Sequence, residues 1–330
     1  MIYQDVELFN AEEVEEFDGG VMLQRFTKEA CRDTQYRASW MVSAAMGCEI
    51  RFVAESDVFW ITLGAVTKDI NVYVMRGDYF YDKYTIKAGT KTVLEFENHD
   101  FLSEYKKIDE ARFSHNVWRF YFEYEGPIVY YGIRSLHGNV RPPHTSEKPK
   151  KTILAYGSSI THGCWAMDSR NSYIQQAAQR LNMDVMNKGM SGACRLENSI
   201  CDFLIDLKGW DIAFLELGVN VLDQYSVEKF EQCAEYLVKN LCDRNTDKPV
   251  FLTGSYYNHI SLSENREKSD LFEAVLMNIR DKYGLSNLHY VSGEKIMDST
   301  EYLSRDVVHP SDWGHIRMGE NLARIIEKNI

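Results

Sequence analysis

The chain has 330 residues, 45% of them hydrophobic, and a formal net charge of −12 at pH 7. This length suits two domains or one large one. The acidic balance, with no basic block larger than residues 148–151, argues against a nucleic-acid partner. No window approaches the roughly 18 apolar residues of a membrane-spanning helix, so we expect no membrane partner.

The cysteines and the N-terminal residues indicate the cellular compartment in which the protein is expected. The first ten residues, MIYQDVELFN, have neither a basic head nor an apolar core and do not resemble a signal peptide. The seven cysteines are odd in number and form no CxxC pair or regular spacing. We therefore expect reduced thiols and a cytoplasmic location.

The first half of the chain has the pattern of short strands. Between residues 48 and 136, β-branched and aromatic runs alternate with glycine-containing turns, and long helical periodicity is absent. This pattern predicts an antiparallel β-sandwich or jelly roll, which we assign to residues 1–145. The predicted strands are 49–53, 58–63, 70–75, 92–96, 117–124 and 128–133.

Residues 137–151 hold three of the six prolines and are predicted to be a linker or strap between two domains. After them, short apolar runs alternate with helical segments, which predicts a second domain over 149–330. Strand–helix alternation indicates a parallel sheet with helices on both faces, an α/β fold. The predicted strands are 152–156, 184–187, 211–217, 249–253 and 288–291.

Two helices of the second half have clear apolar faces. The helix over 227–243, with Ser226 as its N-cap, is predicted to be buried on one side. The last helix begins at about Ser311. The inward residues are predicted to be Phe230, Ala234, Leu237, Val238 and Leu241 in the first helix, and Ile316, Leu322, Ala323 and Ile326 in the second.

Four loops follow strands or precede the last helix, where ligands of parallel sheets gather. Their sequences are GSSIT at 157–161, NKGMSG at 187–192, GVN at 218–220 and DVVHP at 306–310. A serine hydroxyl needs a base to become a nucleophile, a histidine is such a base near neutral pH, and a carboxylate orients the histidine. Glycine N–H groups and an asparagine amide suit an oxyanion.

Each loop alone has a simpler interpretation. Gly-Ser-Ser is more often a turn than a nucleophile, Asn220 alone is more often a helix cap, and Asp-x-x-His-Pro is common before a helix that starts at proline. The four together, in this order and at strand ends, favour a catalytic site.

The four segments resemble the blocks of the SGNH, or GDSL-type, hydrolase superfamily, and the resemblance covers residues 152–330. It implies a flavodoxin-like domain in which Ser159 is the nucleophile, His309 the base and Asp306 its orienting carboxylate. It also implies an oxyanion hole formed by the backbone of Ser159, the backbone of Gly189 and the side chain of Asn220.

The chain departs from the family pattern at two positions beside these residues. The family often has an aspartate where this chain has Ser158, so any hydrogen-bonding role of that carboxylate is missing or replaced. Many members continue Gly-x-Asn with an aspartate, whereas Val221 stands here.

Other hydrolase motifs fit less well. The Gly-x-Ser-x-Gly elbow fails because Thr161 stands where its second glycine belongs. A P-loop fails because its glycine spacing is wrong and Cys164 replaces its lysine. A metal face is conceivable from the three-residue spacing of Asp306, His309, Asp312 and His315, but Pro310 interrupts it. His315 is then a surface or packing residue, and His162 lines the pocket mouth or lies exposed on the turn.

We therefore expect a serine esterase without metal or cofactor. Two-domain members that resemble this layout include carbohydrate esterases that remove acetyl groups, which implies a small-molecule or oligosaccharide ester as substrate. The alternatives are an acyltransferase that uses the same acyl-enzyme, and a non-catalytic carbohydrate-binding protein with aromatic side chains of the first domain as its binding face. The sequence is also compatible with a homo-oligomer.

Overall fold

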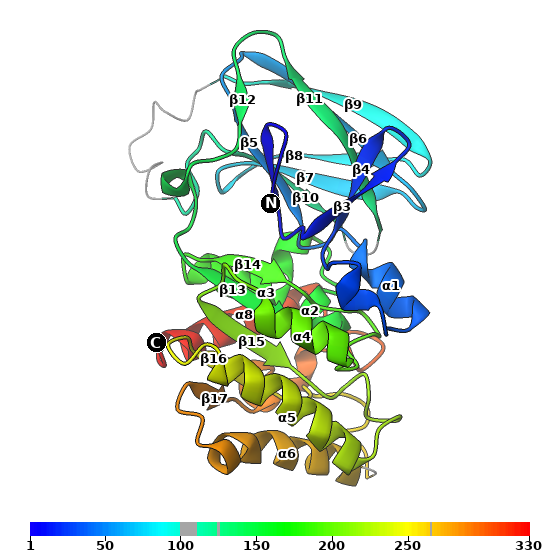
Figure 1. Ribbon diagram of the computed structural model, residues 1–330, viewed down its shortest axis with the longest axis vertical. Helices are drawn as coiled ribbons and strands as arrows, with labels where there is room; N and C mark the ends of the chain where they lie inside the picture. The colour runs from blue at the N-terminus through cyan, green and yellow to red at the C-terminus, as the bar shows by residue number, and fades with distance from the viewer. Residues whose placement is uncertain (100–110, 124–125, 265) are drawn as a thin grey trace. The chain divides into compact units, whose positions relative to one another are not determined.

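The computed structural model describes residues 1–99, 111–123, 126–264 and 266–330, except the side chains of Tyr36 and Ser39. The chain forms two compact units (Figure 1). The first contains residues 1–27 and 42–150, and the second contains residues 28–41 and 151–330. The second unit thus includes a segment, 28–41, that the sequence analysis had assigned to the first domain.

The first unit is built from two antiparallel sheets, as predicted for a sandwich. One sheet has the order β1-β2-β5-β10-β7-β8, with β12 beside β5, and the other has the order β3-β4-β11-β6-β9. The strands are β1 Ile2–Tyr3, β2 Val6–Phe9, β3 Glu13–Phe17, β4 Gly20–Gln24, β5 Glu49–Ala54, β6 Val58–Ala65, β7 Ile70–Arg76, β8 Tyr79–Ile86, β9 Thr90–Glu97, β10 Trp118–Phe122, β11 Ile128–Ser135 and β12 Val140–Arg141.

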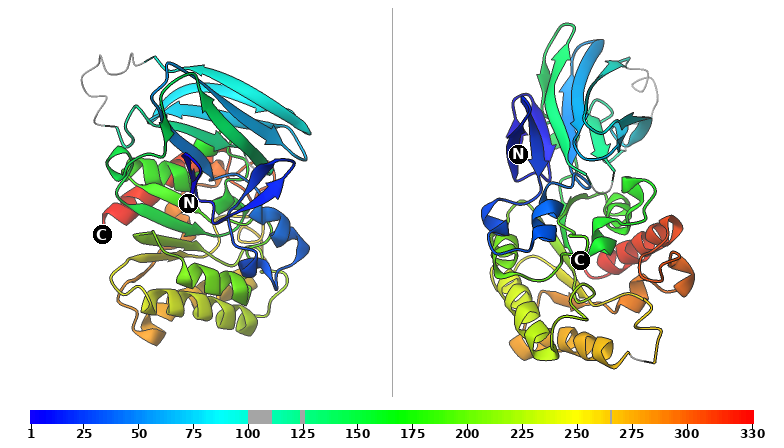
Figure 2. Two further views of the ribbon diagram at one scale, coloured as in Figure 1. Left: turned by 45° about the horizontal axis from the view of Figure 1, so that its top comes forward. Right: turned by 90° about the vertical axis from the view of Figure 1, so that its right-hand side faces the viewer.

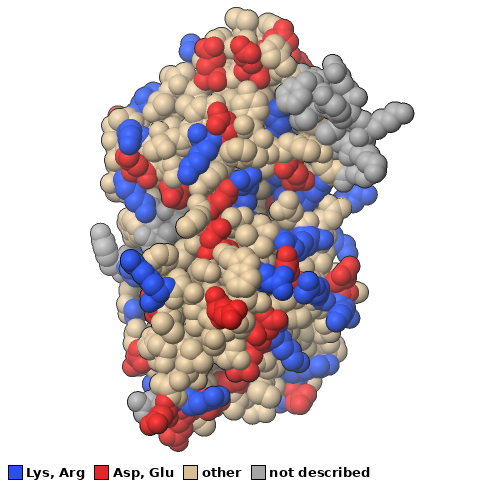
Figure 3. All heavy atoms as spheres, turned by 180° about the vertical axis from the view of Figure 1, so that it is seen from behind, with Lys and Arg blue, Asp and Glu red and all other residues tan. Residues whose placement is uncertain are grey.

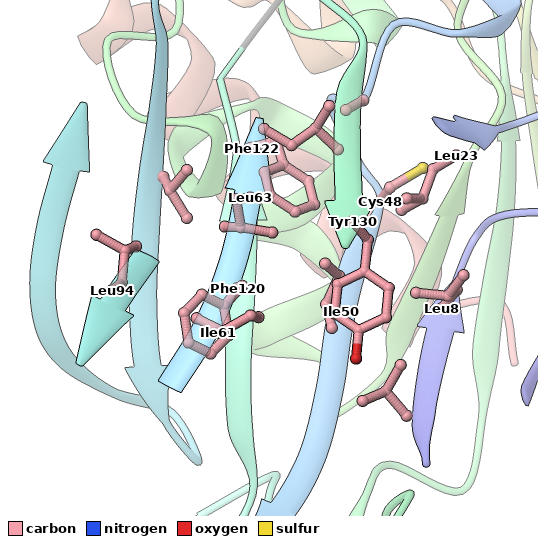
Figure 4. Packing of buried hydrophobic residues seen from close by; sticks show 14 of the residues in the cluster. Leu8, Leu23, Cys48, Ile50, Ile61, Leu63, Leu94, Phe120, Phe122 and Tyr130 are labelled. Carbon is pink, nitrogen blue, oxygen red and sulfur yellow. The ribbon is translucent and has the colours of Figure 1, made fainter. Parts of the chain in front are cut away.

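Alternating side chains from both sheets form one core (Figure 4). Along β6, every second residue points inward, because successive side chains of a strand lie on opposite faces. Phe59 of this strand makes an edge-to-face contact with Trp118 of β10, with ring centroids 4.9 Å apart. Phe120, two residues further along β10, stacks on Phe52 of β5.

All six strands predicted in this half exist, with ends displaced by a few residues; Tyr124, in the fifth of them, lies outside the described residues. The sequence pattern did not predict β1 to β4, β8 or the two-residue strand β12, which lies in the predicted strap. The first five residues of β8 are all exposed, so this strand has no alternation between buried and exposed positions that a pattern could reveal. The predicted strap is held to the first unit by β12, which pairs with β5, and by the ion pair between Lys148 and Glu7.

The second unit is a parallel sheet of order β14-β13-β15-β16-β17 with helices on both faces, which confirms the α/β prediction (Figure 1). Its strands are β13 Thr152–Tyr156, β14 Asp184–Asn187, β15 Ile212–Glu216, β16 Val250–Thr253 and β17 Leu288–Tyr290. The helices are α1 Tyr36–Val42, α2 Ser159–His162, α3 Tyr173–Arg180, α4 Asn198–Asp206, α5 Val227–Asp243, α6 Glu267–Tyr283, α7 Gly293–Ile296 and α8 Asp312–Glu327.

Helices α5 and α8 cover opposite faces of this sheet (Figure 2). Helix α5 begins at its predicted cap, since the Ser226 hydroxyl accepts from Lys229 N–H at 3.2 Å. Helix α8 begins near Ser311, as predicted, and the Ser311 hydroxyl caps it by accepting from Gly314 N–H at 3.1 Å. The inward residues predicted for α5 are buried. In α8, Ile316 is only half-buried, because its place on the inner face is taken by His315 and Met318.

Charges of both signs are interspersed on the face drawn in Figure 3. In the described part of the chain, no helix combines the length and the apolar character that crossing a membrane requires.

The first unit contains a buried ion cluster on β5 and β10. The Glu49 carboxylate accepts from Arg51 Nε at 2.7 Å and from Arg119 Nε at 2.9 Å, and all three side chains are almost fully buried. Burial would raise the pKa of Glu49, but the guanidinium groups of Arg119 and Arg51 outweigh it and hold the pKa below its usual range. Removing the carboxylate would leave two buried cations without their shared counter-charge.

We expect Glu49→Gln to lower the free energy of unfolding by about 3–5 kcal/mol, because it breaks a buried ion pair by removing one partner. Denaturant unfolding at pH 7 measures this loss. Glu16→Gln, at an exposed position on β3, is the control and should change stability by less than about 0.5 kcal/mol. Equal stability of the two variants would contradict the role of the cluster.

Candidate active site

The predicted strand ends meet at one edge of the parallel sheet. Pairing places Tyr156 of β13 opposite Leu215 of β15, and Ala155 of β13 opposite Asn187 of β14. Hydrogen bonds connect the loops that follow. Met190 N–H donates to the Gly157 carbonyl at 2.8 Å. Asn187 Nδ2 donates to the carbonyl of residue 161 at 2.9 Å.

The loop after β13 turns sharply into the short helix α2, of which Ser159 is the first residue. Ser158 caps this helix, since its hydroxyl accepts from Ile160 N–H at 3.1 Å. Gly163 ends it in the left-handed conformation, with φ of 105°. A cap on one side and a glycine on the other thus hold Ser159, which is 7% exposed, at a defined place above the strand end.

The predicted serine, histidine and aspartate lie in one chain of hydrogen bonds. Ser159 Oγ is 2.7 Å from His309 Nε2, and His309 Nδ1 is 2.8 Å from Asp306 Oδ2. Although Ser159 and His309 are 150 residues apart in the sequence, the structure brings them together. The arrangement allows the ring to take a proton from the serine while the carboxylate holds the opposite nitrogen.

Asp306 is fixed as an anion by the turn that carries it. Its Oδ1 accepts from Val308 N–H at 3.0 Å, from His309 N–H at 2.9 Å and from the Ser304 hydroxyl at 3.0 Å. Burial alone would raise the pKa of Asp306, but the hydrogen bonds from His309, Val308 and Ser304 outweigh it and lower the pKa below its usual value. The group is therefore ionised near neutral pH.

The predicted oxyanion donors differ in what they contact. Asn220 Oδ1 accepts from Cys194 N–H at 3.1 Å, which fixes the orientation of the amide and turns its NH₂ group the other way. Gly189 N–H, by contrast, donates to Asn187 Oδ1 at 2.9 Å. A Cβ at Gly189 would lie 2.4 Å from His162 N, so this glycine is needed for close packing of two backbones.

Gly192, three residues further along the same loop, was not singled out by the sequence analysis. It has a left-handed φ of 64° and is half-buried. Among the described residues, neither the Gly192 N–H nor the Ser159 N–H has a hydrogen-bond acceptor. The loop is supported by Arg37, whose Nε donates to the Ser191 carbonyl at 2.7 Å.

The residues of the alternative metal face have other contacts. Asp312 accepts from Met167 N–H and from Asn171 Nδ2. His315 is completely buried; its Nε2 donates to the Cys164 carbonyl at 2.8 Å, and burial lowers its pKa to about 4. It is thus a packing residue, the second of its two predicted roles.

His162 is also completely buried, within α2. Its predicted exposure on the turn is therefore wrong, since the helix turns the ring into the interior, and it does not line an open mouth either. The sequence pattern alone does not distinguish a turn that continues into a buried helix from a turn whose side chains are exposed to solvent.

A pocket of about 470 Å³ lies elsewhere in the second unit, beside α6 and β17. Its walls include Ser255, Glu273, Tyr290 and Glu294, and none of the predicted site residues lines it. Burial, with the nearby carboxylates of Glu294 and Asp270, raises the pKa of Glu273 to about 7.

Comparison with known proteins finds a matching sequence family and solved structures of similar fold. The profile of the GDSL-like Lipase/Acylhydrolase family matches residues 150–327, more than half of the chain. No curated protein matches the chain by sequence.

Among solved structures, a salicylyl-acyltransferase (SsfX3) from a tetracycline biosynthetic pathway is similar, with a TM-score of 0.81 and 17% identity over 98% of this chain and 95% of that one. A family two carbohydrate esterase from Cellvibrio japonicus has a TM-score of 0.65 and 13% identity over 98% and 95%. An acetyl xylan esterase (Est2A) from Butyrivibrio proteoclasticus has a TM-score of 0.63 and 11% identity over 100% and 96%. At these identities the likeness shows the fold, which includes the β-rich region ahead of the parallel sheet.

The contacts of the two adjacent serines predict which of them reacts. Ser159 Oγ lies against the histidine ring, whereas Ser158 Oγ is completely buried and donates to Glu216 Oε2 at 2.8 Å. After treatment with an organophosphate, mass spectrometry should find the adduct on Ser159. Ser158→Ala should still be labelled and Ser159→Ala should not; an adduct on Ser158 would contradict the assignment.

Proposed function

The chain belongs to the GDSL-like Lipase/Acylhydrolase family, and on this basis we propose that it is a serine esterase. The observation that carries the proposal is the hydrogen-bonded series Ser159–His309–Asp306, in which each contact is 2.7 or 2.8 Å long. Three such groups suffice for acyl transfer, and no step of the mechanism requires a metal or a cofactor.

In the first half-reaction, His309 Nε2 takes the proton of Ser159 Oγ, which attacks the carbonyl carbon of the ester. Asp306 stabilises the imidazolium that forms. The tetrahedral intermediate collapses when the C–O bond to the alcohol breaks, and the imidazolium gives its proton to the leaving oxygen. In the second half-reaction, His309 activates a water molecule, which attacks the acyl-enzyme and releases the acid and Ser159.

The oxyanion of each intermediate needs donors aimed at it. We assign Ser159 N–H and the Asn220 amide, whose oxygen is already held by Cys194. For the third donor, the geometry favours Gly192 N–H over the Gly189 N–H predicted from the sequence, because the latter already donates to Asn187. The loop that carries Gly192 follows β14. Through the hydrogen bond from Met190 N–H to the Gly157 carbonyl, it contacts the turn 157–161, which we call the nucleophile turn.

We propose an acetylated carbohydrate or another small ester as substrate. Support comes from the carbohydrate esterase of Cellvibrio japonicus and the acetyl xylan esterase, each of which is matched over at least 95% of its length. Both units of this chain thus have counterparts in proteins that act on sugar esters.

A second candidate is acyl transfer to an alcohol in place of water. The observation that favours it is the similarity to the salicylyl-acyltransferase, whose TM-score of 0.81 exceeds those of the two esterases. Both activities use the same acyl-enzyme on Ser159 and differ in the second half-reaction.

We further propose a cytoplasmic location and no nucleic-acid or membrane partner. The buried thiols of Cys194, Cys201, Cys233 and Cys242 suit a reducing compartment. The acidic net charge of −12 opposes binding to phosphate backbones.

The activity test is a screen of aryl esters of increasing acyl length beside acetylated oligosaccharides. We expect hydrolysis that is fastest for acetyl and is abolished by Ser159→Ala. Repeating the assay with an added sugar alcohol separates the two candidates, because a transferase forms the new ester at the expense of free acid. Hydrolysis that survives Ser159→Ala, or no turnover of any ester, would contradict the proposed function.

The oxyanion role of Asn220 predicts a selective loss. Removing one such donor costs on the order of 10²–10³ in kcat in comparable sites, so Asn220→Ala should lower kcat by about that factor and leave KM nearly unchanged. Asn329→Ala, at the exposed end of the chain, is the control. A change confined to KM would mean that Asn220 binds the substrate rather than the transition state.

A further inference from the structure

Glu216, the last residue of β15, is a buried carboxylate that the proposed mechanism does not use. It is 1% exposed and lies next to the loop that carries Ser159, since β15 pairs with β13. Glu216 was not among the predicted site residues, because a glutamate that ends an apolar run has no local feature to distinguish it. Burying a charged group is unfavourable unless several hydrogen bonds compensate for the lost water.

One oxygen of Glu216 holds both sides of the nucleophile turn. Its Oε2 accepts from Ser158 N–H at 2.7 Å, from the Ser158 hydroxyl at 2.8 Å and from the Thr161 hydroxyl at 3.0 Å. Ser158 precedes Ser159, and Thr161 follows it by two residues. Three donors from the two flanks therefore converge on a single carboxylate oxygen.

The glycine before the turn is required by this contact. A Cβ at Gly157 would lie 2.6 Å from Glu216 Oε2 and 2.4 Å from Thr161 Oγ1, closer than any carbon can approach. The first glycine of the GSSIT segment thus admits the carboxylate, in addition to allowing a tight turn.

The neighbours of Glu216 on other elements are tyrosines and a thiol. Tyr173 of α3 touches Thr161 through a 2.7 Å hydrogen bond, and Tyr256 and Cys194 follow β16 and β14. Burial raises the pKa of all three groups above the usual values, so they are neutral near pH 7. Burial also raises the pKa of Glu216, to about 7, although the hydrogen bonds from Ser158 and Thr161 favour its ionised form.

We propose that Glu216 is a positioning residue for the nucleophile: its ionised carboxylate holds Ser158 and Thr161 and thereby sets the direction from which Ser159 Oγ meets His309. The family often has a carboxylate at the position of Ser158, and here the neighbouring strand supplies one instead. The inference rests on the proposed function, since it concerns the same reaction.

The ionised form is the stronger acceptor for the three hydrogen bonds on Oε2, because bonds to a charged oxygen are stronger than bonds to a neutral one. When the pH falls below the pKa of Glu216, the added proton removes the charge that strengthens these hydrogen bonds, so Ser158 and Thr161 are held less firmly and kcat falls. His309 must also be neutral to act as a base, so its protonation lowers kcat in the same direction. The acid limb of log kcat against pH is therefore steeper than one in the wild type, over the roughly one to two pH units that correspond to a 10–10²-fold loss on neutralising Glu216.

The test compares Glu216→Gln, Glu216→Asp and Glu273→Gln with the wild type in aryl-ester kinetics between pH 4.5 and 9. A displacement of about 1 Å in an active site can cost on the order of 10² in rate, so Glu216→Gln should lower kcat by roughly 10–10² with KM within about twofold. Its acid limb should have a slope of one. Glu216→Asp keeps the charge and should retain the steeper limb with an intermediate kcat.

Glu273→Gln is the matched control, because Glu273 is also a partly buried carboxyl with a pKa raised to about 7, in a pocket without predicted site residues. It should match the wild type in kcat and in slope. Thermal unfolding of each variant checks that it is folded. If Glu216→Gln does not fold, the rate at which an organophosphate labels the wild type is measured against pH instead. An acid limb with a slope of one in that plot overturns the inference.

A kcat within twofold of the wild type in folded Glu216→Gln, or a loss confined to KM, also overturns it. These results leave the proposed function intact, because the wild type remains active. If the wild type neither turns over an ester nor takes the label on Ser159, the proposed function fails and the inference fails with it.

Discussion

The contact between Gly157 and Glu216, at the ends of β13 and β15, is the constraint on which the catalytic geometry depends. Parallel pairing of the two strands brings the residues together, and only a glycine leaves room for the carboxylate. The carboxylate then fixes Ser158, which caps α2, and Ser159 is the first residue of that helix. A side chain at the end of β15 thus holds the turn after β13 from which Ser159 extends.

The features of this chain that could be predicted are those marked by a short stretch of sequence, such as an apolar run, a helix cap or a motif. Strands β13 and β14 and helix α5 have the bounds predicted from apolar runs and from the Ser226 cap. The positions of Ser159, Asp306 and His309 followed from family-like blocks, and the structure brings these residues within hydrogen-bonding distance.

The features that escaped prediction depend on neighbours far away in the sequence. Glu216 acquires its role from Ser158, 58 residues earlier, and His162 is buried because α2 turns it inward. The engagement of Gly189 by Asn187 is a matter of loop geometry, which the sequence pattern of Asn-x-Gly does not specify. Residue type shows which chemistry is available at a strand end, whereas tertiary contacts decide which atoms are directed at the substrate.

The segment 28–41 is a further case in which residues distant in the sequence support the candidate site. It lies between two strands of the first unit, yet it belongs to the second. Arg37 of this segment donates to the Ser191 carbonyl, 154 residues away, and the Ser199 hydroxyl donates to the Ala30 carbonyl at 2.7 Å. The loop that follows β14 is therefore supported by residues from the other half of the chain, so the second unit is incomplete when the chain is cut at the predicted domain boundary.

Solvent access at the triad bears on the choice between hydrolysis and transfer. Ser159 is 7% exposed, and the side chains of His309 and Asp306 are 20% and 33% exposed. The ring that must activate the second nucleophile is thus in contact with solvent, and water needs no binding site of its own to reach it. A transferase must keep water away from the acyl-enzyme or bind an alcohol more effectively than water competes. The solvent contact of His309 supports the proposed hydrolysis over the proposed acyl transfer, two activities that the shared fold does not separate.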